Sequence, residues 1–234
     1  MHAFFRIALL SCLLLCVEQE SFGMAQEPIK KTKTKAHPTP KKKPALNKFS
    51  ESALAHQLLD GLRGIEIGAS AHNPFGLKTL NVDYCDDYTT DFKQSELKTC
   101  GEYAPVHIVS PGDDLPFKDN VWDFVISSHV VEHFYDPIKT VKEWLRVVKP
   151  GGYVYIIAPH KERTFDRDRP RTSFEELLDR HEHPNPPEVD LHGHYSVWIT
   201  EDFLTLCERM QWKVVTFQDI DDKVGNGFTV VIQK

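Results

Sequence analysis

Gly64-Ile65-Glu66-Ile67-Gly68-Ala69-Ser70 is the stretch that decides the fold of this chain. It has the pattern of a short apolar strand that stops at a glycine, and a glycine there lets the backbone approach a ligand closely. Further strand patterns lie at 79–84, 105–110, 121–129 and 152–159. Helical patterns lie at 50–62, 136–148, 172–183 and 199–211. Strands that alternate with helices predict right-handed βαβ units and a mostly parallel sheet.

The last two strand patterns, at 212–220 and 227–234, differ from the others because only a short turn-rich segment separates them. A short connection forces two strands to pair antiparallel. We therefore expect one reversed strand at the end of an otherwise parallel sheet.

The 234 residues divide into three parts by composition. Residues 1–25 resemble a targeting segment, 26–49 a disordered Lys/Pro-rich linker, and 50–234 a folded domain. The overall composition, 41% hydrophobic and 26% charged, is ordinary for a globular protein. A net charge of -6 argues against general affinity for nucleic acids, so no specific nucleic-acid partner is predicted. The sequence does not predict an oligomeric state.

The apolar run at 7–17 is too short to span a bilayer comfortably and fits the core of a secretory signal. If residues 1–23 are translated, we expect a secreted, periplasmic or membrane-anchored protein. A start at Met24 is the alternative, and it would give a cytoplasmic protein. The basic linker is either a solvated spacer or a segment that rests on anionic lipid.

Polar residues follow the predicted strands at the edge where ligands bind in open α/β sheets. Gly68 ends the first strand and Asp83 the second, while Ser128 and His129 end the fourth and His160 the fifth. An acid at the end of the second strand can accept both hydroxyls of a ribose. These features suit a cofactor that contains adenosine.

The missing features narrow the choice of cofactor. A dinucleotide fingerprint needs G-x-G-x-x-G and a helix that holds a pyrophosphate. Here Ser70 stands where the next glycine would fall, and Pro74 and Gly76 leave no room for a long helix before the second strand. This disfavours a nicotinamide oxidoreductase and favours S-adenosylmethionine, which has an adenosine and no pyrophosphate.

Several motifs together resemble the class I S-adenosylmethionine-dependent methyltransferases with a type 11-like domain. They are 64–70 (GIEIGAS), Asp83, 114–117 (DLPF) with 122–128 (WDFVISS), 132–137 (EHFYDP) and 145–152 (LRVVKPGG). The resemblance implies a Rossmann-like, seven-stranded, mostly parallel sheet with an antiparallel C-terminal strand and helices on both faces.

The same resemblance implies roles for individual residues. Glu66 would hold the amino-acid end of S-adenosylmethionine, Gly68 would pass beneath it, and Asp83 would bind the ribose. Asp113 and Asp114 would sit by the adenine, because the acid that often precedes the LPF motif would fall at Pro111. Ser70 and Ser128 complete the predicted cofactor-binding set. Ser70 departs from the family pattern, which has a second glycine there.

Residues 160–178, after the fifth strand, carry many charges that predict a substrate-facing loop. Arg163 and Arg169 could clamp an anionic substrate, and the alternative is a solvated loop with internal ion pairs. His160 is the first candidate for a general base and His129 the second, although His129 could equally be a packed core ring.

Four histidines form two H-x-H pairs, His181 with His183 and His192 with His194. They could form a zinc set. We instead predict no metal and place His192 and His194 in an acceptor pocket. The sequence thus predicts methyl transfer to a small-molecule or glycan-like acceptor. A non-catalytic, cofactor-binding partner or scaffold module is the alternative.

Overall fold

The computed structural model describes residues 48–187 and 193–234. The predicted targeting segment and the linker up to residue 47 lie outside the described residues. Among the described residues, no helix has both the length and the apolar character needed to cross a membrane.

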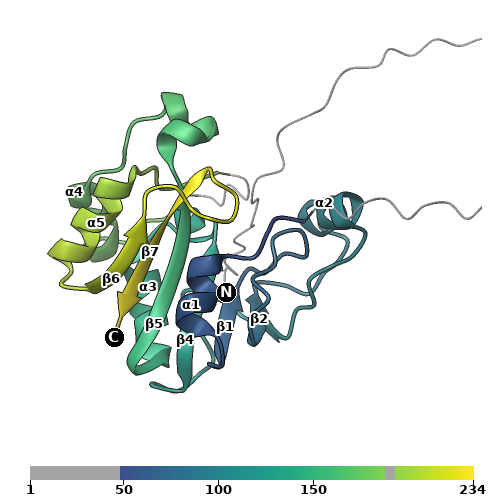
Figure 1. Cartoon of the computed structure of the whole chain (residues 1–234). Helices are drawn as coiled ribbons and strands as arrows, with labels where there is room; N and C mark the ends of the chain where they lie inside the picture. The colour runs from purple at the N-terminus through teal and green to yellow at the C-terminus, as the bar shows by residue number, and fades with distance from the viewer. Residues whose placement is uncertain (1–47, 188–192) are drawn as a thin grey trace, which may run out of the picture.

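One seven-stranded sheet organises the domain, and its strands follow the order β3-β2-β1-β4-β5-β7-β6 (Figure 1). The strands are β1 Gly64–Ile67, β2 Thr79–Asp83, β3 Ile108–Val109, β4 Trp122–Ser128, β5 Val148–Pro159, β6 Lys213–Gln218 and β7 Gly227–Gln233. Strands β1 to β5 pair in parallel, and β7 runs antiparallel to both of its neighbours, β5 and β6. The predicted fold class and the single reversed strand are confirmed.

The helices lie largely where their sequence patterns predict. They are α1 Ala53–Leu59, α2 Asp91–Cys100, α3 Pro137–Val147, α4 Phe174–Glu182 and α5 Thr200–Arg209, with short 3₁₀ helices η1 Val131–His133, η2 Lys161–Arg163 and η3 Phe165–Asp168. The side chain of Asp136 caps α3, as its position before Pro137 predicts. Helix α1 begins later than expected, because Ser52 rather than Ser50 accepts from the N–H of Ala55. Helix α2 was not predicted.

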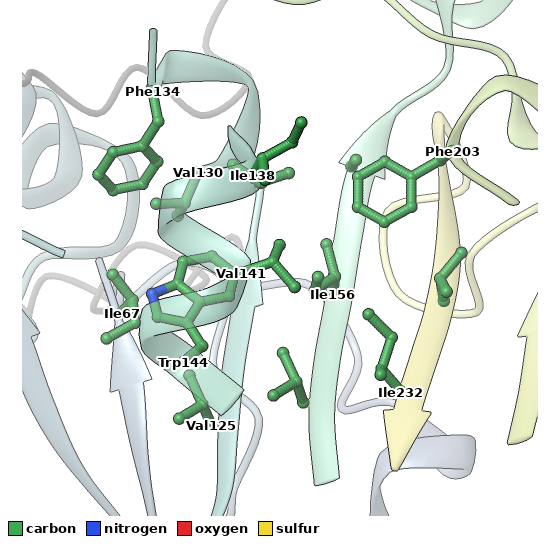
Figure 2. Packing of buried hydrophobic residues seen from close by; sticks show 14 of the residues in the cluster. Ile67, Val125, Val130, Phe134, Ile138, Val141, Trp144, Ile156, Phe203 and Ile232 are labelled. Atoms are coloured by element: carbon green, nitrogen blue, oxygen red, sulfur yellow. The ribbon is translucent and has the colours of Figure 1, made fainter. Parts of the chain in front are cut away.

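The larger part of the core lies between the sheet and α3 and α5 (Figure 2). Trp144 and Ile138 of α3 are fully buried and belong to the same cluster as Val125 of β4 and Ile156 of β5. Fully burying such a side chain contributes about 1.5–3 kcal/mol. This packing fixes the carboxyl ends of β4 and β5, where the predicted site lies.

The opposite face of the sheet carries α1, which lies in front of β4 and β5 in Figure 1. Ala55 and Leu59 of α1 pack with Phe124, Ile126 and Tyr155. No helix lies between β1 and β2, as Pro74 and Gly76 predict. A groove of about 340 Å³ borders that connection and is lined by residues that include Glu66, Thr79 and His107.

Candidate functional site

The turn after β1 begins at Gly68, which has a φ of 68°. Only glycine adopts this left-handed conformation without steric cost, so the turn requires a glycine here. The N–H of Gly68 donates to the carbonyl of Val82 over 2.9 Å, and the N–H of Ala69 donates to Oδ1 of Asn81 over 3.0 Å. The turn is therefore tied to β2, and the predicted strand-to-glycine turn is present.

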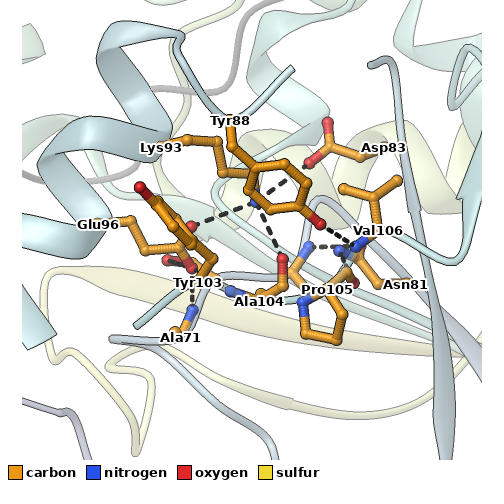
Figure 3. A network of polar contacts seen from close by, with 12 residues as sticks. Ala71, Asn81, Asp83, Tyr88, Lys93, Glu96, Tyr103, Ala104, Pro105 and Val106 are labelled. Carbon is orange, nitrogen blue, oxygen red and sulfur yellow. Dashed lines mark hydrogen bonds and ion pairs between the residues drawn. The ribbon is translucent and has the colours of Figure 1, made fainter. Parts of the chain in front are cut away.

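Glu96 of α2 anchors the residues that follow this turn (Figure 3). Its buried carboxylate accepts from the N–H groups of Ala71 and Ala104, and the hydroxyl of Ser70 lies 3.2 Å from the same oxygen. Ser70 also contacts Nδ1 of His72. Ser70 thus ties the turn to α2 and to its own neighbour, and its predicted contact with the cofactor stays a prediction.

Asp83 lies at the end of β2, at the position predicted for a ribose-binding acid, and it is 5% exposed. Its carboxylate lies 3.7 Å from the ammonium of Lys93, which in turn lies 3.2 Å from Glu96. Burial raises the pKa of Asp83 to about 6, although the positive charge of Lys93 opposes the shift. Figure 3 shows Lys93 between the two carboxylates. The sequence analysis did not identify Lys93 or Glu96.

The loop after β3 carries the two acids predicted to lie by the adenine. The indole N–H of Trp144 donates to the carbonyl of Gly112 over 2.8 Å and holds this loop against α3. The carboxylate of Asp113 pairs with Lys139 of α3 at 2.8 Å, and Asp114 is exposed. The Asp113 carboxylate thus contacts α3, and the predicted contacts of Asp113 and Asp114 with the adenine stay predictions.

Glu66 lies inside β1, paired in register with Asn81 and Ile126. Its carboxylate lines the groove along the β1–β2 connection, 3.4 Å from the hydroxyl of Thr79. Burial raises the pKa of Glu66 to about 7, and the nearby charge of Lys223 opposes this shift. The structure thus places Glu66 on a face of the sheet rather than in the turn that Gly68 begins.

A second set of polar side chains follows β4. Ser128 accepts from the side-chain amide of Asn73 over 3.2 Å, which links the ends of β4 and the β1–β2 connection. His129 is 2% exposed and has a φ of 55°, which is uncommon for a residue with a side chain. Burial lowers the pKa of His129 to about 4, and the ring is therefore neutral at pH 7.

Glu132, His133 and His194 come together beside His129, completely or almost completely buried. Oε1 of Glu132 lies 3.7 Å from Nε2 of His133 and 3.9 Å from Nε2 of His194. Burial raises the pKa of Glu132 to about 7 and lowers the pKa of His133 to about 3. His194 is a predicted substrate residue, whereas the sequence analysis gave Glu132 and His133 no chemical role.

His160 caps the 3₁₀ helix η2, because its Nδ1 accepts from the N–H of Glu162 over 3.2 Å. A neutral imidazole has one nitrogen that accepts and one that donates. The accepting nitrogen of His160 is therefore already engaged, and the ring cannot take a proton without losing this cap. The geometry does not favour His160 as the general base.

The two arginines predicted to clamp a substrate have internal partners. Arg163 contacts the carboxylate and carbonyl of Asp219 and the carbonyl of Gly227. Arg169 donates to Oδ1 of Asp166 over 2.6 Å and to the carbonyl of His194 over 2.7 Å. These contacts match the alternative of a loop held by its own ion pairs.

The four-histidine zinc set is not assembled among the described residues. His181 contacts Asp136 and Lys142, and His183 is exposed beside Asp179. His194 lies instead with Glu132 and His133, and His192 lies outside the described residues. An H-x-H spacing brings two rings together only on an extended chain, and His181 lies in the last turn of α4.

The strand order, the reversed β7, the glycine turn after β1 and the acid at the end of β2 together define a class I S-adenosylmethionine-dependent methyltransferase fold. Residues 67–156 match the family described as "Methyltransferase domain", and this region of the chain, from the end of β1 to β5, belongs to that family. Its members use S-adenosylmethionine as the methyl donor, which confirms the predicted cofactor class.

Known relatives are similar over parts of the chain. An uncharacterized protein of Methanocaldococcus jannaschii is 33% identical over 97 residues, which cover 40% of this chain and 43% of that protein. A probable S-adenosylmethionine-dependent methyltransferase of Mycolicibacterium smegmatis is 36% identical over 63 residues, which cover 26% of this chain and 24% of that protein. The chain thus spans less than half the length of these relatives.

A solved S-adenosylmethionine-dependent methyltransferase from Methanosarcina mazei has the same fold. It superposes with a TM-score of 0.50 at 16% identity, over 78% of this chain and 97% of that one.

Proposed function

We propose that this chain transfers the methyl group of S-adenosylmethionine to a small-molecule or glycan-like acceptor. The proposal rests on one observation: Gly68, Asp83 and Ser128 lie together at the edge formed by the carboxyl ends of β1, β2 and β4. Ligands of open α/β sheets bind at this edge. Asp83 would accept the ribose hydroxyls, and Gly68 would let the methionine portion pass close to the backbone.

Methyl transfer from a sulfonium is an in-line displacement, so its main requirement is alignment of the acceptor with the methyl group. A protonated acceptor also needs a base. His129 is the better of the two predicted candidates, since it follows β4 directly and its buried ring is neutral. His160, by contrast, uses its accepting nitrogen as a helix cap.

Three features support a neutral, hydroxylated acceptor. Arg163 and Arg169, the two arginines predicted to clamp an anionic group, pair with internal partners instead. Phe165 is 62% exposed beside His194, with ring centroids 4.6 Å apart, and it offers a flat apolar face next to polar groups. The net charge of -6 disfavours nucleic acid.

Calorimetry with S-adenosylmethionine, S-adenosylhomocysteine and NAD tests the proposal. We expect both sulfur compounds to bind and NAD not to bind. Asp83→Asn should weaken both by about ten- to a hundredfold, because each lost charge-assisted hydrogen bond is worth about 1.5–3 kcal/mol. Asp179→Asn is the matched control, since the side chain of Asp179 is exposed at the surface of α4 and pairs with the exposed His183.

If neither S-adenosylmethionine nor S-adenosylhomocysteine binds at millimolar concentration, the proposal is contradicted. Transfer is then measured with methyl-labelled S-adenosylmethionine and a panel of neutral sugars and small hydroxylated compounds. Tight binding of the cofactor without label transfer to any acceptor would favour the scaffold alternative.

A further inference from the structure

We infer that Glu132, His133 and His194 form a binding site for one divalent transition-metal ion of the zinc class. Each residue offers one ligand atom, and the three atoms lie within 4.8 Å of one another. Two imidazoles and one carboxylate are a ligand set that zinc takes in proteins. The inference concerns the ion alone and does not depend on the proposed function.

Burial of this cluster without a ligand leaves polar atoms unpaired. Both carboxylate oxygens of Glu132 and Nε2 of His133 are buried and have no hydrogen-bond partner among the described residues. Buried polar groups in proteins are nearly always paired, because an unpaired one loses its hydration without compensation. One oxygen of Glu132, a ring nitrogen of His133 and a ring nitrogen of His194 lie within 4.8 Å of one another and could share one positively charged ligand.

The second argument is the orientation of the two rings. Nδ1 of His194 donates to Asp166, whose carboxylate also accepts from Arg169 and is therefore held as an anion. Nδ1 of His133 lies 3.1 Å from the carbonyl of Gly193, which can only accept. Both rings consequently carry their proton on Nδ1, and both Nε2 lone pairs are directed to the Glu132 side. Metal-binding histidines are oriented in this way by a carboxylate or carbonyl on the other nitrogen.

The third argument is that the two ligand segments are already held together by their backbones. The N–H groups of Tyr195 and Ser196 donate to the carbonyl of Glu132 over 2.8 and 3.3 Å. The rings of His133 and His194 pack edge to face with centroids 4.8 Å apart. The site is thus built from two rigidly joined segments that lie far apart in the sequence.

An ion would draw the three ligand atoms closer together. Zinc bonds of about 2.0–2.2 Å at tetrahedral angles place ligand atoms about 3.3–3.5 Å apart. The carboxylate oxygen lies 3.7 and 3.9 Å from the two nitrogens, and all three atoms lie within 4.8 Å of one another, so side-chain rotations must bring them together. Three protein ligands leave one position, as in catalytic zinc sites. If the proposed function holds, an acceptor oxygen could complete the coordination there.

Metal binding is tested on the full chain in the absence of S-adenosylmethionine. The protein is stripped with a chelator, titrated with Zn²⁺ by calorimetry, and loaded with Co²⁺ to record its visible spectrum. We expect one ion per chain and the intense visible bands of four-coordinate Co²⁺. Zn²⁺ should also raise the melting temperature of the stripped protein, since a ligand that binds only the folded state stabilises it.

Variants assign the site to these residues. Glu132→Gln and His133→Gln should weaken Zn²⁺ binding at least a hundredfold, and Asp166→Asn should weaken it about ten- to a hundredfold through His194. Glu132→Gln is expected to fold, because a neutral amide costs less to bury than an unpaired carboxylate. His183→Asn is the matched control, and it should bind Zn²⁺ like the unaltered chain.

Two outcomes would overturn the inference. One is a stripped chain that neither binds Zn²⁺ in a one-to-one ratio nor gives the Co²⁺ bands. The other is binding that Glu132→Gln leaves unchanged. Either result can occur whether or not S-adenosylmethionine binds, so failure of the metal site is distinguishable from failure of the proposed function.

Discussion

Replacement of Glu96 with alanine tests the network that fixes the turn after β1 (Figure 3). Glu96 is fully buried, and its carboxylate serves the N–H groups of Ala71 and Ala104 and the ammonium of Lys93. The structure therefore predicts a large loss of stability from a residue that has no apolar packing role.

The expected loss of stability follows from the buried groups that would lose Glu96 as their partner. Two buried N–H groups would lose their acceptor, at about 1–3 kcal/mol each. Lys93 would keep Asp83, at 3.7 Å, as its carboxylate partner and lose the closer one at 3.2 Å. Breaking a buried ion pair costs about 3–5 kcal/mol. We expect Glu96→Ala to lower the free energy of unfolding by at least about 5 kcal/mol, and the melting temperature by at least about 10 °C.

Urea unfolding followed by tryptophan fluorescence measures this change. Glu102→Ala is the control, because Glu102 is exposed and pairs with Lys48 at the surface, where such pairs contribute about 0.2–1 kcal/mol. Glu96→Gln should fall between the two, since its amide oxygen can still accept while its charge is lost. A Glu96→Ala variant within about 1 kcal/mol of Glu102→Ala would refute the reasoning.

Three further predictions concern Asp83 and the loop after β3. Because the pKa of Asp83 is raised to about 6, its negative charge is lost as the pH falls through that value. S-adenosylmethionine should therefore bind about tenfold more weakly at about pH 5 than at about pH 7.5. Calorimetry should show no such pH dependence for the Asp83→Asn variant. Trp144→Phe removes the hydrogen bond to Gly112 and should cost about 1–3 kcal/mol in urea unfolding, and a neutral result would contradict the role of that bond. Gly112→Ala would place a Cβ 2.8 Å from Phe134 and 2.9 Å from Ile67, so it should cost about 1–3 kcal/mol by overpacking, whereas unchanged stability would show that the loop can move aside.

The sheet, and the residues at the carboxyl ends of its strands, could be predicted because the sequence patterns that mark them are local. Apolar runs that end in glycine or a polar residue marked β1, β2 and β4, and Gly68, Asp83 and Ser128 lie where those runs end. Asp136 and Pro137 marked the start of α3 in the same local way. The carboxyl ends of parallel strands share one edge, so the order of these residues was enough to place them together.

Helix α2 was missed because its buried face is only half apolar. Lys93 and Glu96 are buried there beside Phe92 and Cys100, whereas helix prediction from sequence looks for an apolar stripe. Local signals for its ends were nevertheless present: Thr90 caps the first turn, and Gly101, with a φ of 76°, ends the last. The partners that make the buried charges tolerable lie on other segments and have no local signature.

The histidine cluster was misassigned for a related reason. The sequence analysis paired histidines that are two residues apart, but His194 lies with Glu132 and His133, about sixty residues earlier. That contact depends on the path of residues 193–198 across the end of β4, where Tyr195 and Ser196 bond to Glu132. Spacing along the chain carries no information about such a contact.

The missing second glycine and the missing helix after β1 have one physical explanation. In dinucleotide-binding folds, free N–H groups at a helix N-terminus hold the pyrophosphate. Here the N–H of Ala71 is taken by the carboxylate of Glu96, and Ser70 contributes a hydroxyl to the same group. With Lys93 and an ionised Asp83 beside it, the network carries one net negative charge (-1 -1 +1). We expect such a turn to repel a pyrophosphate and to favour the positively charged sulfonium of S-adenosylmethionine. Ser70 in place of a glycine is therefore consistent with a site selective for S-adenosylmethionine over NAD.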